Sequence, residues 1–323
     1  MMKKTSKVAN TLRELRLVRS LSDLKILYDK LRFYRRLYRN DYHRPTAAPL
    51  SLQIEPTNNC NARCICCSRE RMRRAKGCMD FQLFAKIVDD AARAGIRRVE
   101  LYLHGESLLH PEIARMLAYL RSRQIAVNLT TNGMLLDSAR SAAILEAYPS
   151  SAASITVSML GASAEVHEKT MPGVGHERVV ENIHNFLRLR KETRSNGPIL
   201  QTIFYRLDEN AEEAATYAAY WRKVADHANY SEAISQAFAR GPGGECGAPV
   251  RDKICTQVFR RMIVYWNGDV TTCCIDVDGD HVVGNLERQT IEELWNCPRM
   301  ACFRRISRER RFADIPLCRH CDM

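Results

Sequence analysis

The chain has 323 residues, of which 46% are hydrophobic and 27% charged, enough apolar material for one large domain or one large and one small domain. This composition excludes a disordered chain, and no apolar run approaches the ~18 residues that a membrane-spanning helix needs. Most of the net charge of +12 lies in residues 1–48, which hold 13 Lys and Arg against 4 Asp and Glu. Because the remaining charge is nearly balanced, we expect no nucleic-acid partner.

Residues 1–48 form the first predicted segment, a basic amphipathic helix. Apolar residues recur at helical spacing from Leu24 to Tyr38 among several arginines, and the pattern stops before Pro45. Its apolar side either packs on the rest of the protein or makes peripheral contact with an anionic membrane or an acidic partner. The first residues lack the apolar stretch and cleavage site of a signal peptide, so we expect a cytoplasmic protein.

Residues 49–240 alternate short apolar runs with helical patterns, as βα units of a parallel sheet do. The strands are expected at 50–57, 97–105, 126–133, 154–160 and 199–207, and the helices at 81–95, 112–124, 138–148 and 176–193. We therefore predict an α/β fold, a partial parallel (β/α)6-type barrel. In such folds the chemistry gathers at the carboxyl ends of the strands, so Cys60, Gly105, Asn132 and Ser158 are expected on one face.

Residues 241–323 are predicted to be a small separate C-terminal subdomain that binds a metal cluster. A glycine-rich linker at 240–247 precedes a hairpin over 255–286, with its turn at Asn267-Gly268, and a helix over 290–306. The chain then ends in a Cys-x2-Cys pair.

Thirteen cysteines are unusual for a chain expected in a reducing compartment, which favours metal or redox chemistry over disulfides. Cys60, Cys64 and Cys67 lie within eight residues in a loop after the first strand. Three thiolates from one loop can hold three irons of a [4Fe-4S] cluster and leave the fourth iron open for chemistry. A zinc site or structural thiols are the alternatives.

A second group of four cysteines can close a cluster completely, namely Cys255, Cys273, Cys318 and Cys321. Their terminal Cys-x2-Cys pair also suits zinc, and Cys274 is an alternative ligand to Cys273.

The pattern Cys60-x3-Cys64-x2-Cys67 after a first strand, with His-Gly-Glu after the second strand and Thr-Asn-Gly after the third, resembles the radical S-adenosylmethionine (SAM) superfamily. The similarity runs from about residue 50 to the C-terminus. It implies that SAM binds the open iron and is split into methionine and a 5′-deoxyadenosyl radical that removes hydrogen from a substrate. A reducing electron donor such as flavodoxin or ferredoxin is implied as a partner.

The resemblance also implies roles for single residues. The Gly-Gly-Glu motif of the family occurs here as His104-Gly105-Glu106, so the first glycine is replaced while the glutamate that binds the SAM amino group is kept. Gly105, Glu106, Asn132 and Ser158 are the implied SAM-binding residues. The aromatic residue that often precedes the third cysteine is Cys66 here.

The C-terminal cysteines resemble the shortened SPASM region, or twitch subdomain, which holds one auxiliary [4Fe-4S] cluster. Two reactions fit this resemblance: dehydrogenation of an alcohol in a sugar-like or cyclitol-like small molecule, as in aminocyclitol dehydrogenases, and epimerisation. In an epimerase, Cys246 of the linker would be the catalytic hydrogen donor. Modification of a ribosomal peptide, electron carriage without SAM, and zinc-dependent binding are further alternatives.

Overall fold

The computed structural model describes residue 28 and residues 46–232, 254–319 and 321. The expected N-terminal helix, the linker and Cys246 lie outside the described residues. The strands are β1 (Ser51–Ile54), β2 (Arg98–Leu101), β3 (Ala126–Thr131), β4 (Ala153–Met159), β5 (Ile199–Arg206), β6 (His227–Glu232), β7 (Arg261–Val264), β8 (Asp269–Thr271) and β9 (Val282–Asn285). The α-helices are α3 (Phe81–Arg93), α4 (Ile113–Ser122), α5 (Ser138–Ala147), α6 (Ala164–Thr170), α7 (His176–Glu192), α8 (Ala214–Val224), α10 (Ile291–Trp295) and α11 (Pro298–Glu309).

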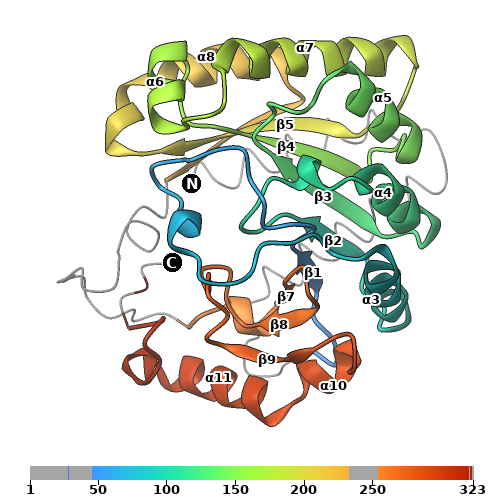
Figure 1. Cartoon of the computed structure of the whole chain (residues 1–323), viewed down its shortest axis with the longest axis vertical. Helices are drawn as coiled ribbons and strands as arrows, with labels where there is room; N and C mark the ends of the chain where they lie inside the picture. The colour runs from blue at the N-terminus through green and yellow to red at the C-terminus, as the bar shows by residue number, and fades with distance from the viewer. Residues whose placement is uncertain (1–27, 29–45, 233–253, 320, 322–323) are drawn as a thin grey trace.

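One sheet in the order β6-β5-β4-β3-β2-β1-β7-β8-β9 organises the chain. Its first six strands are parallel neighbours, so the predicted (β/α)6 architecture is confirmed, and the barrel is open. Figure 1 shows α3, α4, α5 and α7 on the outer side of the curved sheet and the segment after β1 inside the curve. This arrangement leaves the inner face of the sheet and the carboxyl ends of its strands available for chemistry.

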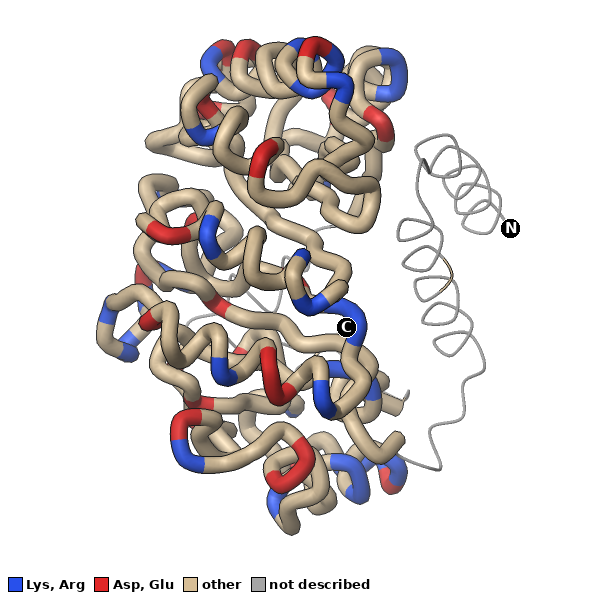
Figure 2. Tube along the Cα trace, turned by 90° about the vertical axis from the view of Figure 1, so that its right-hand side faces the viewer, with Lys and Arg blue, Asp and Glu red and all other residues tan. Residues whose placement is uncertain are grey.

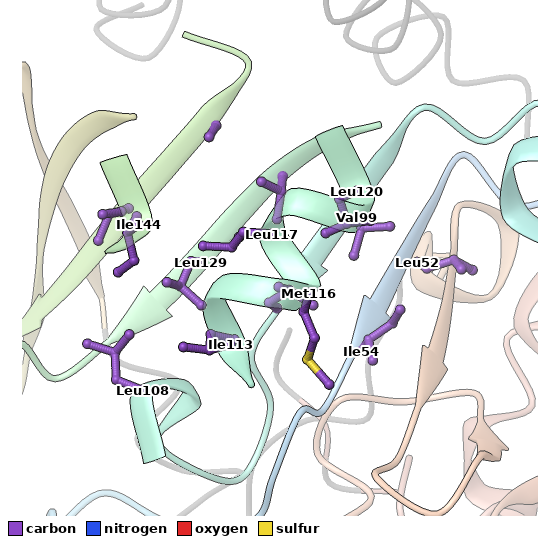
Figure 3. Packing of buried hydrophobic residues seen from close by; sticks show 14 of the residues in the cluster. Leu52, Ile54, Val99, Leu108, Ile113, Met116, Leu117, Leu120, Leu129 and Ile144 are labelled. Carbon is purple, nitrogen blue, oxygen red and sulfur yellow. The ribbon is translucent and has the colours of Figure 1, made fainter. Parts of the chain in front are cut away.

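Alternation along the strands separates the two faces of the sheet. Leu52 and Ile54 of β1 are fully buried under the helices, as is Val99 of β2. Helix α4 packs Met116 and Leu117 over these strands (Figure 3). The intervening residues of each strand face the inside of the curve, because side chains alternate with a period of two.

The C-terminal hairpin extends the barrel sheet. β7 pairs in parallel with β1, in a register that places Leu52 beside Met262. β7 and β8 form the predicted hairpin, with Gly268 at φ 85°, the left-handed conformation that a tight turn needs. The cysteine-containing C-terminal segment is thereby attached to the strand that carries the first cysteine loop.

The helix expected over 290–306 is divided into α10 and α11, and that prediction of one continuous helix is wrong. Pro298 begins α11, where its missing N–H costs no hydrogen bond, and Cys297 caps the helix by accepting from the N–H of Met300. Thr290 and Glu293 form a reciprocal capping box at the start of α10. Short, separately capped helices result.

Basic and acidic residues are interspersed along the described part of the chain (Figure 2). Among its helices, none is both long and apolar enough to cross a membrane.

Candidate functional site: a cysteine loop and a four-cysteine cavity

The loop that carries Cys60, Cys64 and Cys67 begins where β1 ends, and its last residues, 75–78, lie against its first residues, 57–58. Thr57 pairs with Cys78 in an isolated antiparallel bridge, and the Thr57 hydroxyl donates to the carbonyl of Gly77 at 2.6 Å. The side chain of Asn58 donates to the Ala75 carbonyl at 2.8 Å and accepts from the Gly77 N–H at 2.9 Å. These bonds close the neck of the loop and fix where the cysteines begin.

Two glycines hold the backbone of this cysteine loop against the barrel. A Cβ atom on Gly105 would lie 2.1 Å from the Thr57 carbonyl oxygen and 2.8 Å from that of Asn59. A Cβ atom on Gly173 would lie 2.5 Å from the carbonyl oxygen of Asn61, and Gly173 has φ 91°. Only residues without a side chain allow so close an approach. Close packing against residues 57–59 is thus a steric reason for glycine at position 105, separate from the SAM contact that the resemblance implies.

The three thiols are half-buried, and burial raises the pKa of each of them. The Cys64 thiol is further disfavoured as a thiolate by Cys66, Cys67 and Cys60. The buried guanidinium of Arg69 partly opposes this rise in the pKa of Cys60 and Cys67, and it donates to the Ala62 carbonyl at 2.9 Å. Such crowded thiols suit a positively charged metal centre, which removes the cost of deprotonating them.

Glu106 lies beside this cysteine loop as a buried carboxylate. It accepts from the Thr131 hydroxyl at 2.6 Å, the Asn132 N–H at 2.7 Å and the Leu108 N–H at 3.0 Å. Its backbone N–H donates to the carbonyl of Asn59 at 2.8 Å. Burial is the largest influence on the Glu106 carboxyl and raises its pKa, while the three hydrogen bonds act in the opposite direction.

Asn132 joins the end of β3 to the cysteine loop. Its amide donates to the side-chain oxygen of Asn61 at 2.8 Å, and its own oxygen accepts from the Met134 N–H at 3.0 Å. The register pairs Thr131 with Val157, so half-buried Ser158 follows on β4 beside Asn132. The predicted carboxyl-end residues thus occupy one edge of the sheet.

The C-terminal cysteines surround an apolar cavity. Its lining includes Cys255, Cys273, Cys318 and Cys321, together with apolar side chains such as Phe303 and Ile315. Cys274 is not in this lining. Its thiol is hydrogen-bonded to that of Cys273, and Arg261 and Glu100 lie near it. The four thiols predicted as one ligand set therefore converge on a single space.

The environments of His104 and Cys66 follow from the structure rather than from the sequence pattern. His104 is buried, and its Nε2 atom lies 3.1 Å from the carbonyl oxygen of Cys274. Burial raises the pKa of the Cys66 thiol to about 11, and Cys66 lies near Tyr205 of β5.

Sequence reasoning missed Arg69 and Gly173. The Pro172-Gly173 pair is a turn signal that pointed to the glycine, but no local pattern pointed to the arginine.

Comparison with known families fits this geometry. The family model of the radical SAM superfamily matches residues 54–218, which includes the cysteine loop, Glu106 and Asn132. The chain belongs to the radical SAM superfamily. A second family model, described as an iron-sulfur cluster-binding domain and named SPASM, matches residues 255–322 and includes the four cavity cysteines.

Curated relatives match parts of the chain. A tungsten-containing aldehyde ferredoxin oxidoreductase cofactor-modifying protein of Pyrococcus furiosus is 35% identical over 26% of this chain and 24% of its own length. A probable GTP 3′,8-cyclase of Thermococcus kodakarensis is 28% identical over 47% of this chain and 48% of its own length. A PqqA peptide cyclase of Granulibacter bethesdensis is 28% identical over 31% of this chain and 26% of its own length. The matches thus span at most about half of these proteins.

Solved structures share the fold over most of the chain. BtrN in complex with AdoMet and 2-DOIA has a TM-score of 0.58 at 17% identity, covering 85% of this chain and 93% of BtrN. anSMEcpe with bound AdoMet and Cp18Cys peptide has a TM-score of 0.60 at 17% identity, covering 84% and 88%. SuiB of Streptococcus suis, bound to the precursor peptide SuiA, has a TM-score of 0.57 at 15% identity, covering 86% and 71%.

The family establishes the cofactors of this chain as a SAM-binding [4Fe-4S] cluster, an auxiliary iron-sulfur cluster and SAM. The structure supplies thiols and a carboxylate of the right chemistry for them, and among the described residues no three such groups already surround the position of a single metal ion. Three crowded thiols lie beside the buried carboxylate of Glu106, and four further thiols face one apolar cavity. The two iron-sulfur clusters and SAM are the cofactors predicted from the sequence.

Proposed function

We propose that this chain oxidises an alcohol carbon of a polyhydroxylated, sugar-like or cyclitol-like small molecule to a carbonyl. The observation that carries the proposal is the polar inner face of the sheet. Barrel interiors are commonly filled by branched apolar side chains, whereas here the inward positions of successive strands hold amides, hydroxyls and an ion pair.

These inward side chains lie in one row across the sheet and form two hydrogen-bonded groups within it, here called the polar row. The Asn128 oxygen accepts from the Thr156 hydroxyl at 2.8 Å and from the Gln201 amide at 3.2 Å. At the other end of the row, Arg261 donates to the Gln53 oxygen at 2.8 Å and pairs with Glu100 at 3.1 Å. Amides and hydroxyls both donate and accept, so they can exchange these bonds for bonds to the hydroxyls of a substrate.

A second inward layer lies between this row and the SAM-binding edge. It includes the half-buried residues Tyr102, Thr130 and Ser158, each two positions further along its strand, and half-buried Tyr205 lies four positions beyond Gln201. Two strand residues correspond to about 7 Å, so a small ring can contact the polar row while one of its carbons faces the carboxyl edge.

We assign Cys60, Cys64 and Cys67 to the SAM-binding cluster, Cys255, Cys273, Cys318 and Cys321 to the auxiliary cluster, and Gly105, Glu106, Asn132 and Ser158 to SAM. When bound, these groups supply the 5′-deoxyadenosyl radical and an electron acceptor. Conversion of a carbinol to a carbonyl transfers one hydrogen atom to that radical, releases the hydroxyl proton and passes one electron to the acceptor. Within the protein, Glu106 would hold the SAM ammonium group and the polar row would orient the alcohol.

The remaining predictions belong to the same proposal. We infer a subdomain division near residues 240–241, a cytoplasmic location, and flavodoxin or ferredoxin as electron donor. The basic helix over residues 1–48 stays a prediction, as does its contact with a membrane surface.

A peptide substrate is the second candidate, because SuiB and anSMEcpe share the fold and have structures with bound peptides. BtrN, which shares the fold over a similar length, has a structure with 2-DOIA bound. Epimerisation with Cys246 as hydrogen donor stays a third prediction.

One anaerobic experiment separates these reactions. The reconstituted enzyme receives dithionite, SAM and fractionated metabolite extract in deuterated water, and 5′-deoxyadenosine and product masses are measured. A product two hydrogens lighter, formed equally by Cys246→Ala, supports dehydrogenation. A product of unchanged composition with one solvent deuterium, absent with Cys246→Ala, refutes it in favour of epimerisation. A modified peptide as the only product refutes the small-molecule proposal.

The polar row is tested by Gln201→Leu, with Asn185→Ala on the outer helix α7 as a control amide. Loss of one substrate hydrogen bond, about 1.4 kcal/mol, raises KM about tenfold. Iron content and substrate-free SAM cleavage should stay at the wild-type level in both variants. An unchanged KM for Gln201→Leu would argue against this row as the substrate-binding surface.

A further inference from the structure

A buried polar junction connects the SAM-binding edge to the segment that carries Cys273. Its side chains are Glu55 at the end of β1, Arg74 from the return of the cysteine loop and His104 after β2. His104 stands at the position where the family motif has glycine. The protein therefore has a side chain here that SAM binding by the motif does not require.

The hydrogen bond of His104 to the cluster-bearing segment has a fixed direction. Its Nε2 atom lies 3.1 Å from the backbone carbonyl oxygen of Cys274, and a carbonyl oxygen can only accept. Nε2 therefore carries a proton whether the ring is neutral or charged. On the other side of the ring, Nδ1 lies 3.3 Å from Arg74 and 3.3 Å from Glu55, so both nitrogens are engaged.

Arg74 binds the same segment three residues further along, at Val277. Its guanidinium makes two bonds of 3.0 Å to the Glu55 carboxylate, and its Nε donates to the carbonyl of Val277 at 2.7 Å. The guanidinium also stacks on the ring of Tyr265 at 3.7 Å, and the hydroxyl of Tyr265 donates to the carbonyl of Asp276. Three carbonyls of residues 274–277 are thus held by side chains from outside that segment.

The three residues 104–106 contact both cysteine groups. The Glu106 N–H donates to the carbonyl of Asn59, the residue before Cys60, at 2.8 Å. Two residues earlier, His104 donates to the carbonyl of Cys274, the residue after Cys273. Two hydrogen bonds and a tripeptide therefore connect the first cysteine loop with the loop of the cavity cysteine.

We propose that His104 is a positioning residue that fixes the Cys273 loop and, through its N–H, raises the reduction potential of the auxiliary cluster. The Cys274–Ile275 peptide group, whose carbonyl accepts from His104, hydrogen-bonds to the Cys273 thiol through its Ile275 N–H. A donor at the carbonyl strengthens donation by that N–H, and donors to cluster thiolates stabilise the reduced, more negative state. A higher potential makes the auxiliary cluster a better acceptor for an electron that leaves the substrate. This inference rests on the assignment of Cys273 to the auxiliary cluster under Proposed function, but not on the identity of the substrate.

The test compares His104→Gln, whose amide Nε2 can still donate to the Cys274 carbonyl, with His104→Leu, which has similar bulk and no donor. Arg73→Ala is the matched control, because Arg73 is exposed and binds Asp278 of the same region from the surface at 3.0 Å. The full-length enzyme carries both clusters and no substrate, and an EPR-monitored redox titration gives the midpoint potential of each cluster.

His104→Leu should lower the midpoint potential of the auxiliary cluster and leave that of the SAM-binding cluster unchanged, while His104→Gln and Arg73→Ala retain wild-type values. An unchanged potential in His104→Leu overturns the proposal, and equal shifts in the Leu and Gln variants overturn the role of the N–H. If His104→Leu does not load both clusters, His104→Gly, the family's own residue, is titrated instead under the same criterion.

Cys273→Ser separates this proposal from the ligand assignment. Loss of the auxiliary signal supports the assignment on which the role of His104 depends. Persistence of that signal with an unchanged potential overturns the assignment, independently of the results for His104.

Discussion

Replacement of Gly105 by alanine tests whether the approach of the cysteine loop to the barrel is essential. The added Cβ atom would lie 2.1 Å from the Thr57 carbonyl oxygen and 2.8 Å from Asn58 Cα, and both of these are backbone atoms. A normal carbon–oxygen contact is more than 3 Å, so the neck of the loop would have to move by about 1 Å. Overpacking of this kind costs typically 1–3 kcal/mol, a large part of a total stability of about 5–15 kcal/mol.

We therefore expect Gly105→Ala to lower the guanidinium unfolding midpoint and to reduce the iron held by the first cysteine loop. The control is Gly175→Ala, where the new Cβ atom would have no neighbour nearer than 3.9 Å. Iron analysis and chemical unfolding under anaerobic conditions are measured on both variants. If Gly105→Ala keeps both the wild-type midpoint and the full iron content, the steric explanation for this glycine is wrong.

Three further predictions follow from the same geometry. Cys273→Ser should remove about half of the bound iron, whereas Cys274→Ser should keep it, as measured by iron analysis. Of these two neighbouring cysteines, only Cys273 lines the cavity. Simultaneous replacement of Cys60, Cys64 and Cys67 by alanine should also remove about half of the iron and abolish SAM cleavage, while retained cleavage would refute the assignment. Burial and nearby His176 lower the pKa of His167 to about 4, so the unfolded chain binds the proton more readily and stability should fall as pH decreases from 6.5 toward 4. The loss of stability approaches about 3 kcal/mol. Unfolding midpoints measured at several pH values should depend less on pH in His167→Gln than in the wild type. An equal pH dependence in the two proteins would show that His167 is not responsible.

The strands and helices of the barrel could be predicted from the sequence because their apolar residues follow the period of each element. β6, α6 and α8 were not predicted, and the reasons differ for β6 and α6. β6 reads His-Ala-Asn-Tyr-Ser-Glu and has no apolar alternation, since its inward side extends the polar row. α6 has only seven residues, too few for a periodic pattern to be distinct from a loop.

The cysteine spacing pointed to the correct cofactors, but the residues that shape the loop could not be predicted. Arg69 acts on Cys60 and Cys67 from a 3-10 helix, η1 (Ser68–Arg71), whose sequence resembles any charged surface segment. Gly173 meets the carbonyl of Asn61 more than 100 residues away in sequence. Such contacts are set by how separate βα units pack, and no local pattern records them.

The change from glycine to histidine at position 104 illustrates how the two kinds of information combine. The sequence alone shows only that this residue departs from the family motif, and it does not show what the side chain contacts. The structure shows that the ring reaches a carbonyl of the C-terminal segment. Since β7 pairs with β1, that segment lies where an imidazole after β2 can contact it. The contact made by His104 is therefore possible because one continuous sheet places the two cysteine groups at opposite ends of the short peptide 104–106.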